Sequence, residues 1–372
     1  MPRLNISANS GTRVTMDGKE LLTFGGCAYL GLSYHPEIHA EIVRHLSIYG
    51  VSTTASRETT GNTVVHDALE VEIAGFLGQD AALLLTEGYT ANFAMAQGIA
   101  ERCKVAVLDS KSHRSISHAC AGAGLRVELF DHLDASHAAA QARKFSGDGV
   151  AIISDGVFAA DGSVAPVDQL MAALPEDDRS LLVIDDCHGL GVLGRGGRGT
   201  PSHFGLERHP RLLYTGTLGK GLGCYGGFVS GSRAMVDQCR AAGGVYKGTT
   251  PVPPALAAGS RKAIAMLAAH PEMVERLSAN TQRMRGWMSK LGIAQSDIPV
   301  PIFTFWFTPE AKLETIYRSL LERGLLVPLI DYPGGPTDRY FRLSVTALHS
   351  SEEIDRLGAA LVELLAGFDV RR

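Results

Sequence analysis

Seven short apolar runs, separated by segments long enough for helices, constrain the fold of this chain more than any other feature. Each run is three to six residues long. Each is apolar on both faces, as in strands that are covered by helices on both sides. The runs are 81–85, 105–108, 125–130, 150–153, 181–184, 212–214 and 227–230. This alternation predicts an α/β domain with a mainly parallel sheet.

The chain changes character after Pro251-Val-Pro-Pro254. The chain has 372 residues, 45% of them apolar, which is enough for two lobes. We predict a large domain over 41–254 and a smaller α+β domain over 255–372, with residues 1–40 packing against the small domain. The elements predicted for the small domain are a long helical region over 255–292, a strand over 302–307, a helix over 311–324, a strand over 341–345 and a last helix that begins at Ser350 with the capping box Ser350-x-x-Glu353.

Charge and cysteine usage bear on the partners and the compartment. The formal net charge of −4 leaves no electrostatic footprint for nucleic acid or an anionic membrane. The apolar stretches are too short for a spanning helix, and the first residues lack the apolar core of a signal peptide. Six scattered cysteines without a C-x-x-C pair are typical of reduced thiols. We therefore expect a cytoplasmic protein with no nucleic-acid or membrane partner.

Polar residues follow the apolar runs at the point where each predicted strand ends. They are Thr86-Glu-Gly88, Asp109, Asp155, Asp185 and Thr215-Gly-Thr217. Ligands of open α/β sheets bind at the carboxyl ends of the strands. We therefore expect these residues to converge on one edge of the sheet.

Lys220 lies in a glycine-rich turn directly after one of these strands. An ordinary surface lysine is the alternative interpretation, but Thr215 and Thr217 before it and Gly221 and Gly223 after it favour a cofactor site. A buried lysine can form a Schiff base with an aldehyde cofactor. Asp185, at the end of a neighbouring strand, can keep a pyridine nitrogen protonated. Together they predict a pyridoxal-phosphate (PLP) site.

Asp185-Asp-Cys-His188 has a rival interpretation as a metal site, since Asp, Cys and His all bind metals. Successive strand side chains point to opposite faces, and no second ligand pair stands at a usable spacing, so we favour PLP, with His188 near its phenolic oxygen. Gly189-x-Gly-x-x-Gly194 matches a dinucleotide fingerprint. Glycines and a proline just beyond it would break the required helix, so we interpret the match as accidental.

Two further positions fit a planar, phosphorylated cofactor. Gly88 stands between a strand and an apparent helix, and the free amides at a helix start can bind phosphate. His113, in Ser112-His-Arg-Ser115, offers an imidazole that could stack on a planar ring. Each signal alone is weak, because such turns are common and a lone histidine is usually structural.

With these residues in place, the chain resembles the α-oxoamine synthases over about residues 11–365. These are fold-type-I PLP enzymes, and they include 8-amino-7-oxononanoate synthase and serine palmitoyltransferase. The motifs that carry the resemblance are Ala28-Tyr-Leu-Gly-Leu32, His66-x-x-x-Glu70, Glu87-Gly-Tyr-x-Ala-Asn92, Ser112-His-Arg-Ser115, Asp155-Gly-Val-Phe158, Asp185-Asp-x-His-Gly189, Thr217-Leu-Gly-Lys220 and Arg342-Leu-Ser-x-Thr-Ala-x-His349.

The resemblance implies a homodimer with two active sites at the subunit interface, and a role for each site residue. Lys220 would hold the cofactor covalently, Asp185 would pair with the pyridine nitrogen, His188 would bond the phenolic oxygen and His113 would stack on the ring. The residues that would hold the phosphate are Gly88, Tyr89 and Thr217, helped by Thr249 or Thr250 of the other subunit. Arg342 would bind the carboxylate of the amino acid as a planar fork.

The expected reaction condenses a small amino acid with an acyl thioester, releasing the thiol and CO2 and leaving an α-aminoketone. A second hypothesis keeps PLP but replaces acyl transfer by aldol cleavage, racemisation or transamination, which share the same carbanion. A third is a noncatalytic binding or assembly protein of the same fold. Lys220, Asp185 and His188 argue against the third, since only cofactor chemistry needs all three.

Several positions depart from the family pattern. Cys27 stands where most members have an asparagine that contacts the substrate carboxylate, so we assign it to the substrate site. Ala159 replaces a serine, and Ser52-Thr-Thr-Ala-Ser-Arg57 replaces a glycine-rich segment. We also expect the chain to lack most of the N-terminal helical extension that, in members of this family, helps to form the acyl-donor channel. An unusual acyl donor is therefore expected: an acyl-carrier protein thioester, a short acyl-CoA, or none.

Overall fold

The computed structural model describes residues 4–293 and 296–371. Residues 1–3, 294–295 and 372, which the sequence assigned to the N-terminal segment and the small domain, lie outside it. The chain forms two compact units, one of residues 1–34, 159–163 and 272–372 and the other of residues 35–158 and 164–271. No helix in the described part of the chain is long and apolar enough to cross a membrane.

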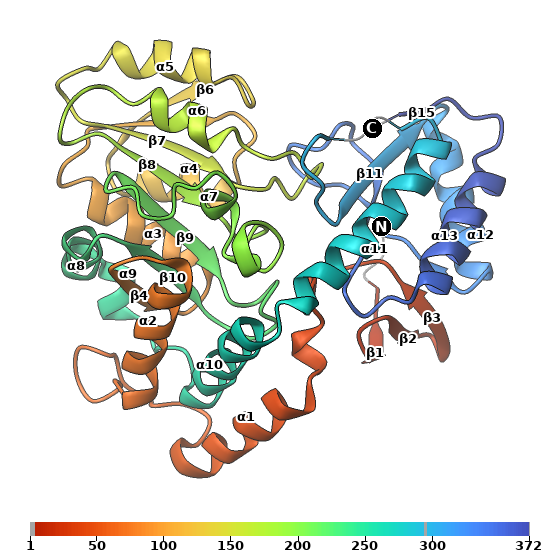
Figure 1. The fold of residues 1–372 in the computed structure, drawn as a ribbon, viewed down its shortest axis with the longest axis horizontal. Helices are drawn as coiled ribbons and strands as arrows, with labels where there is room; N and C mark the ends of the chain where they lie inside the picture. The colour runs from red at the N-terminus through yellow and green to blue at the C-terminus, as the bar shows by residue number, and fades with distance from the viewer. Residues whose placement is uncertain (1–3, 294–295, 372) are drawn as a thin grey trace. The chain divides into compact units, whose positions relative to one another are not determined.

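The unit of residues 35–158 and 164–271 contains one seven-stranded sheet (Figure 1). Its strands are β4 (Ala81–Leu85), β5 (Val105–Asp109), β6 (Arg126–Phe130), β7 (Val150–Asp155), β8 (Leu181–Asp185), β9 (Leu212–Thr217) and β10 (Gly227–Gly231). They lie in the order β4-β10-β9-β8-β7-β5-β6, and only β10 runs antiparallel to its neighbours. All seven apolar runs became strands, which confirms the predicted mainly parallel sheet.

Helices cover this sheet because both faces of its strands are apolar. The helices are α1 (Pro36–Tyr49), α2 (Val64–Leu77), α3 (Gly88–Ile99), α4 (Arg114–Gly122), α5 (Ala135–Arg143), α6 (Val167–Ala172), α7 (Thr200–His203), α8 (Arg233–Ala242), α9 (Gly244–Gly248) and α10 (Pro254–Ala269), with a 3-10 turn, η2 (Arg195–Gly197). Apolar side chains of α3, α4 and α8 form one core with alternate residues of the strands. Helices α2, α5 and α6 also contact the strands, but their side chains do not belong to that core.

One buried carboxylate in the middle of α2 ties this helix and the loop before it to the edge of the sheet. Glu70 accepts hydrogen bonds from the backbone N–H of Leu84 (2.8 Å) and from the guanidinium groups of Arg57 (2.5 Å) and Arg240 (2.9 Å). Arg57 belongs to the loop before α2, and Leu84 to β4, the terminal strand of the sheet. A buried charge is tolerated when it is paired and hydrogen-bonded, as this one is.

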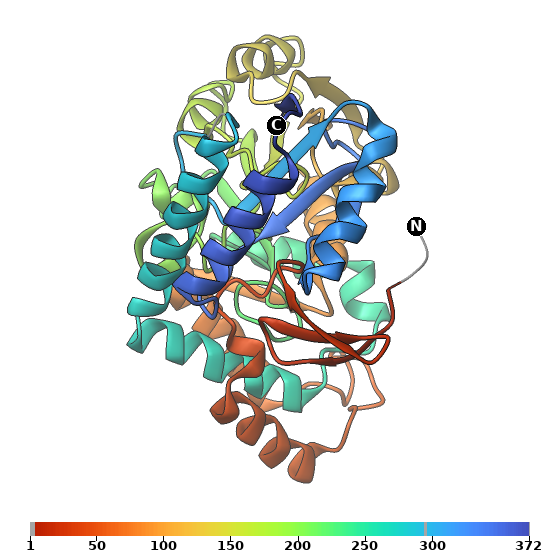
Figure 2. The same ribbon diagram turned by 90° about the vertical axis from the view of Figure 1, so that its right-hand side faces the viewer.

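The other unit is an α+β structure with two four-stranded sheets (Figure 2). The first has the order β1-β2-β3-β12 and the second β13-β14-β11-β15. The strands are β1 (Ile6–Asn9), β2 (Arg13–Met16), β3 (Lys19–Thr23), β11 (Ile302–Phe307), β12 (Leu325–Leu326), β13 (Leu329–Ile330), β14 (Tyr340–Ser344) and β15 (Val370–Arg371). The helices are α11 (Glu272–Lys290), α12 (Leu313–Glu322) and α13 (Ser351–Leu364), with 3-10 turns η1 (Leu32–Tyr34) and η3 (Glu310–Lys312).

The long helical region predicted over 255–292 consists of two helices, α10 and α11. Helix α10 ends at Ala269 and α11 begins at Glu272. Pro271 lies between them, and proline disfavours helical backbone in the residue before it while it is well tolerated at a helix start. Helix α10 packs against α1 and α2, so the sheet-containing unit runs to Pro271, beyond the boundary that the sequence placed after residue 254.

Candidate active site

The register of the sheet brings the polar strand ends to one edge. Asp155, Asp185 and Thr215 pair side by side across β7, β8 and β9. Gly227 of the antiparallel strand β10 faces both Thr217 and Leu85, so the ends of β9 and β4 meet at the same edge. The predicted convergence of these residues is confirmed.

Lys220 lies beside His188 in the loop that follows β9. Its Nζ is 2.9 Å from Nε2 of His188. A side chain at Gly221 would place its Cβ 2.2 Å from the carbonyl oxygen of Leu190, so only glycine lets the lysine loop approach the segment that carries His188. The contact gives an amine whose proton can be shared with an imidazole, and this pairing was not predicted from the sequence.

Asp185 is buried and held by an amide that sequence reasoning did not assign to the site. Nδ2 of Asn92, in α3, donates to Oδ2 of Asp185 (2.7 Å) and to Oγ of Ser115 (2.8 Å). Thr215 donates to Oδ1 of Asn92 (2.7 Å). The only signal in the sequence was the position of Asn92 in the Glu87-Gly-Tyr-x-Ala-Asn92 motif.

Asp155 is a second carboxyl group at this edge. Burial, followed by the neighbouring Asp185, raises the pKa of Asp155 well above its usual range. Its Oδ1 accepts the backbone N–H of His113 (3.0 Å). Burial and the neighbouring carboxylate of Asp185 therefore favour the neutral form of Asp155. The sequence placed Asp155 at the rim but gave it no role.

His113 stands at the N-terminus of α4 with an exposed ring. Its Nδ1 accepts the backbone N–H of Ser115 (3.3 Å) and lies 2.7 Å from the Ser115 hydroxyl. Tyr89 meets it edge-on, with ring centroids 6.3 Å apart. Partial desolvation, reinforced by the positive charge of Lys220, lowers the pKa of His113. These two effects favour the neutral imidazole, and the negative charge of Asp185 opposes them.

Gly88 and Thr217 lie against each other where the sequence predicts a phosphate site. A Cβ at Gly88 would come within 3.2 Å of Cβ of Thr217, so the start of α3 and the end of β9 form a close cradle. Thr217 accepts the N–H of Gly219 (3.1 Å). Glu87 supplies the capping box of α3, which the prediction did not include. Tyr89 directs its hydroxyl to Nδ1 of His118 (2.8 Å).

Thr249 and Thr250 follow α9. Thr249 donates to the carbonyl of Val245 (2.6 Å), and Thr250 is exposed. The sequence assigned both to the partner's site, which a single chain does not test.

The residues predicted to bind the amino-acid carboxylate belong to the other unit. Nη2 of Arg342, on β14, donates to Sγ of Cys27 (3.8 Å). Nε of Arg342 is buried and has no hydrogen-bond partner among the described residues. Burial raises the pKa of Tyr29, beside both side chains, well above its usual range, so the phenol stays neutral. An unpartnered guanidinium N–H fits an incoming carboxylate.

Asp186, adjacent to Asp185, faces away from this cluster into a separate buried contact. Both its oxygens accept from Thr200, from the backbone N–H (2.7 Å) and from the hydroxyl (2.6 Å). The described part of the chain holds no group of three or more His, Cys, Asp or Glu suited to a metal. Along residues 189–194 no helix begins, so the G-x-G-x-x-G match lacks the structure of a dinucleotide fingerprint.

Burial raises the pKa of Asp186 to about 7, from 3.8 for an unperturbed group. The folded state therefore holds this proton more tightly than the unfolded state, and stability falls as the pH rises from about 4 to about 7. We expect Asp186→Asn to raise the unfolding free energy at pH 8 by a few kcal/mol, on the order given by linkage, and to have little effect at pH 4. Urea titrations of both proteins across this range measure the difference. A gain that does not depend on pH would contradict the assigned cause.

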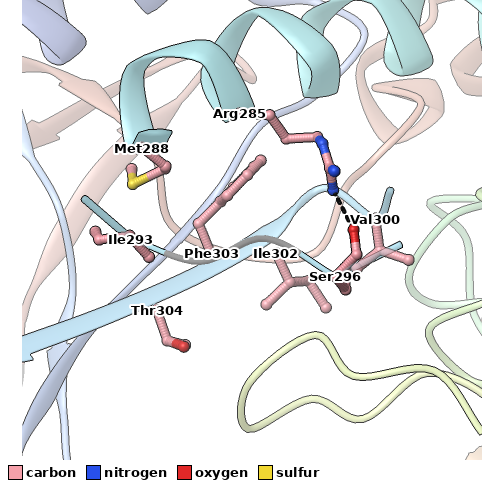
Figure 3. A pocket seen from close by; sticks show the side chains of 8 residues that line it. All are labelled: Arg285, Met288, Ile293, Ser296, Val300, Ile302, Phe303 and Thr304. Atoms are coloured by element: carbon pink, nitrogen blue, oxygen red, sulfur yellow. Dashed lines mark hydrogen bonds between the residues drawn. The ribbon is translucent and has the colours of Figure 1, made fainter. Parts of the chain in front are cut away.

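Two cavities lie apart from these residues. One, of about 440 Å³, lies between α2, β4 and α8 and is lined by Glu70, Arg233 and Arg240 among others. The other, of about 10 Å³, is lined by side chains of α11, β11 and the segment before β11, and Arg285 donates across it to the carbonyl of Ser296 (Figure 3). The second holds no more than a water molecule.

A protein-family model, Aminotransferase class I and II, matches residues 20–361. This chain belongs to that family. An 8-amino-7-oxononanoate synthase of Methylococcus capsulatus is 37% identical over 354 residues, which are 95% of this chain and 91% of the relative. One from Halorhodospira halophila is also 37% identical, over 94% of this chain and 87% of the relative. The resemblance to the α-oxoamine synthases is confirmed.

Solved structures of proteins with this fold are similar to this chain. A serine palmitoyltransferase of S. paucimobilis, solved with PLP and myriocin bound, has a TM-score of 0.90 at 24% identity and covers 97% of this chain and 92% of its own. An 8-amino-7-oxononanoate synthase of Francisella tularensis has a TM-score of 0.79 at 22% identity, covering 93% and 98%. At these identities the likeness shows the fold, and it confirms the predicted fold-type-I architecture.

Proposed function

We propose that this chain is a PLP-dependent C-acyltransferase of the α-oxoamine synthase type. It condenses a small amino acid with an acyl thioester, releases the thiol and CO2, and leaves an α-aminoketone. The observation that carries the proposal is the contact of Lys220 with His188 at the same sheet edge as the Asn92-held Asp185. Relatives of 37% identity that are 8-amino-7-oxononanoate synthases support the same reaction type.

The residues at this edge fit the cofactor. Lys220 would hold its aldehyde, Asp185 its ring nitrogen, His188 its phenolic oxygen, and Gly88, Tyr89 and Thr217 its phosphate. PLP, when bound, supplies an electron sink that stabilises negative charge on the α-carbon of the amino acid.

Side chains of the protein then transfer protons and stabilise charge. The amine of Lys220 accepts the α-proton, and His188, 2.9 Å away, can take up or return a proton from that amine. Asp185 keeps a positive charge on the ring nitrogen. Burial of Asp185 and Asn92 excludes water from this charge, which strengthens the electrostatic interaction.

Arg342 orients the amino acid in this proposal by binding its carboxylate. We expect Arg342→Lys to raise the KM for the amino acid about 10- to 100-fold, because a point charge replaces a bidentate fork and a charged hydrogen bond is lost. Arg339→Lys, on the same segment but paired with Glu314, is the matched control and should leave KM unchanged. Steady-state kinetics with saturating thioester measure both. An unchanged KM in Arg342→Lys would remove Arg342 from the substrate site.

Release of free thiol tests the reaction itself. The purified protein, loaded with PLP, is mixed with acyl-CoA or acyl-carrier protein thioesters and with glycine, alanine, serine or threonine in turn. Thiol release that needs one of the amino acids supports the synthase. Spectral changes of the bound cofactor with amino acids, but no thiol from any thioester, would point to aldol cleavage, racemisation or transamination. A protein that takes up no PLP would point to a noncatalytic role.

We further propose that the enzyme is a cytoplasmic homodimer whose sites are shared between subunits. Apolar side chains within residues 43–71 are exposed on the single chain, among them Val43 (61%), Val51 (78%), Val64 (75%) and Val71 (72%). In the proposed dimer these side chains would be available to pack against the partner subunit. The six cysteines are all free, which suits a reducing compartment.

Mixing two inactive variants tests the shared sites. We expect Lys220→Ala and the double variant Thr249→Ala/Thr250→Ala to be weakly active alone. Random exchange of subunits should restore about one quarter of the sites, since half of the dimers are mixed and each has one intact site. Activity after co-refolding, compared with the unmixed proteins, measures this. No recovery in proteins that sediment as mixed dimers would place both threonines in their own subunit's site or outside any site.

A further inference from the structure

The amide of Asn92 is used to its full capacity, and this fixes the direction of a chain of hydrogen bonds. Asn92 is 1% exposed and Ser115 is also 1% exposed, so water does not compete. A carboxylate only accepts, so the group of Asn92 that faces Oδ2 of Asp185 is its NH2. The second N–H of that group points to Oγ of Ser115, and the carbonyl oxygen takes the hydroxyl proton of Thr215.

The same reasoning fixes the hydroxyl of Ser115. Its oxygen accepts from Asn92, so its own proton is free to be donated to Nδ1 of His113, 2.7 Å away. The backbone N–H of Ser115 also points to this nitrogen, at 3.3 Å. Two donors directed at one nitrogen require a lone pair there. A proton on Nδ1 would meet the backbone N–H head-on.

We propose that Asn92 and Ser115 are positioning residues that hold His113 as the neutral imidazole with its proton on Nε2, so that it can stack on a cationic ring. The role of the neutral imidazole in stacking rests on the proposed function, since the cationic ring is that of PLP, whose nitrogen Asp185 keeps protonated. An imidazolium stacked on such a ring would add a repulsion between like charges. The amide of Asn92 thus has two roles. It holds the carboxylate of Asp185, which keeps the PLP ring positive, and through Ser115 it keeps the imidazole of His113 neutral.

The charges around His113 act in both directions. Desolvation and the positive charges of Lys220, Arg114 and His118 lower its pKa, while Asp185 raises it. These groups bear on whether the ring carries a charge, but they do not choose between its two nitrogens. The choice of tautomer follows from the hydrogen bonds of Ser115 alone.

Nitrogen-15 NMR of histidine side chains tests the tautomer without any turnover. The protein, with and without PLP, is labelled at its 13 histidines, and the loss of one signal pair in His113→Phe assigns His113. We expect one pyridine-like nitrogen, Nδ1, and one pyrrole-like nitrogen, Nε2, at pH 7.5. Ser115→Ala and Asn92→Leu should allow the other tautomer and raise the pKa of His113. Ser117→Ala, on the same helix, should leave the spectrum unchanged, because among the residues that the structure describes the Ser117 hydroxyl donates to the carbonyl of Arg114.

A pyrrole-like Nδ1 or a charged ring in the unmodified protein would overturn the proposal. So would a His113 spectrum and pKa that stay unchanged in folded Ser115→Ala. The spectrum of the unmodified protein decides the tautomer even if Asn92→Leu does not fold. The proposed function can fail separately, because absence of thiol release leaves the tautomer readable.

Discussion

Replacement of Lys220 by alanine is expected to lower turnover at least about 10⁴-fold, the upper range for loss of a positioned acid–base group, because the same amine also holds the cofactor. Its Nζ lies 2.9 Å from Nε2 of His188, which cannot replace it because an imidazole does not form the covalent link. Thiol release measures the rate, and the visible spectrum of the purified protein reports the lost covalent link.

Lys104→Ala is the matched control, since this exposed lysine precedes β5. It should keep the rate and the spectrum of the unmodified protein. A Lys220→Ala protein that condenses amino acid and thioester at the original rate would end the assignment of Lys220 and, with it, the proposed reaction.

Replacement of Asp185 by asparagine is expected to lower turnover about 10³-fold while the cofactor still binds. A carboxylate beside a protonated ring nitrogen contributes about 4 kcal/mol at the effective dielectric of a partly buried pair, and that energy corresponds to a factor of about 10³ in rate. Asparagine has the same shape as aspartate and can still accept the hydrogen bond from Asn92. The loss of turnover therefore measures the effect of the negative charge. Exchange of the α-proton of the amino acid with deuterium, followed by NMR, measures the step that depends on this charge.

The neighbouring residue provides the control for Asp185. Asp186→Asn is the same chemical change one residue later on the opposite side of the backbone, where the side chain bonds Thr200. It should leave proton exchange within a few-fold of the unmodified protein, since the side chain of Asp186 is bonded to Thr200 and not to Asn92 or the other residues of the proposed cofactor site. An exchange rate in Asp185→Asn that falls less than about 10-fold would show that the ring charge does not depend on this residue.

The parts of the site that lie at strand ends could be predicted, because strand position and chemical type are both visible in the sequence. Asp185 and Lys220 belong to this class. Outside the site, the capping box of Ser350 and Glu353 at the start of α13 was also predicted, and the structure confirms it with hydrogen bonds of 3.1 and 3.2 Å. The division between α10 and α11 was missed although Pro271 marked it. The apolar pattern continues on both sides of Pro271, and it was given more weight in the prediction than this single proline.

The network around Asn92 could not be predicted, because its partners come from three elements that are distant in sequence. Ser115 follows Asn92 by 23 residues, Asp185 by 93 and Thr215 by 123. Only the packing of α3 and α4 against the sheet brings these groups within hydrogen-bond distance. The pairing of Cys27 with Arg342, 315 residues apart, has the same origin.

Glu70 has a consequence beyond its place in the core of the fold. Strand β4 ends the seven-stranded sheet, and a terminal strand with free backbone donors is a template on which a strand from another molecule can pair and start aggregation. The carboxylate of Glu70 accepts the outward N–H of Leu84 at 2.8 Å, and α2, which carries it, lies against the strand. One outward donor of this edge strand is therefore satisfied within the chain, and a strand from another molecule has one group fewer with which to pair.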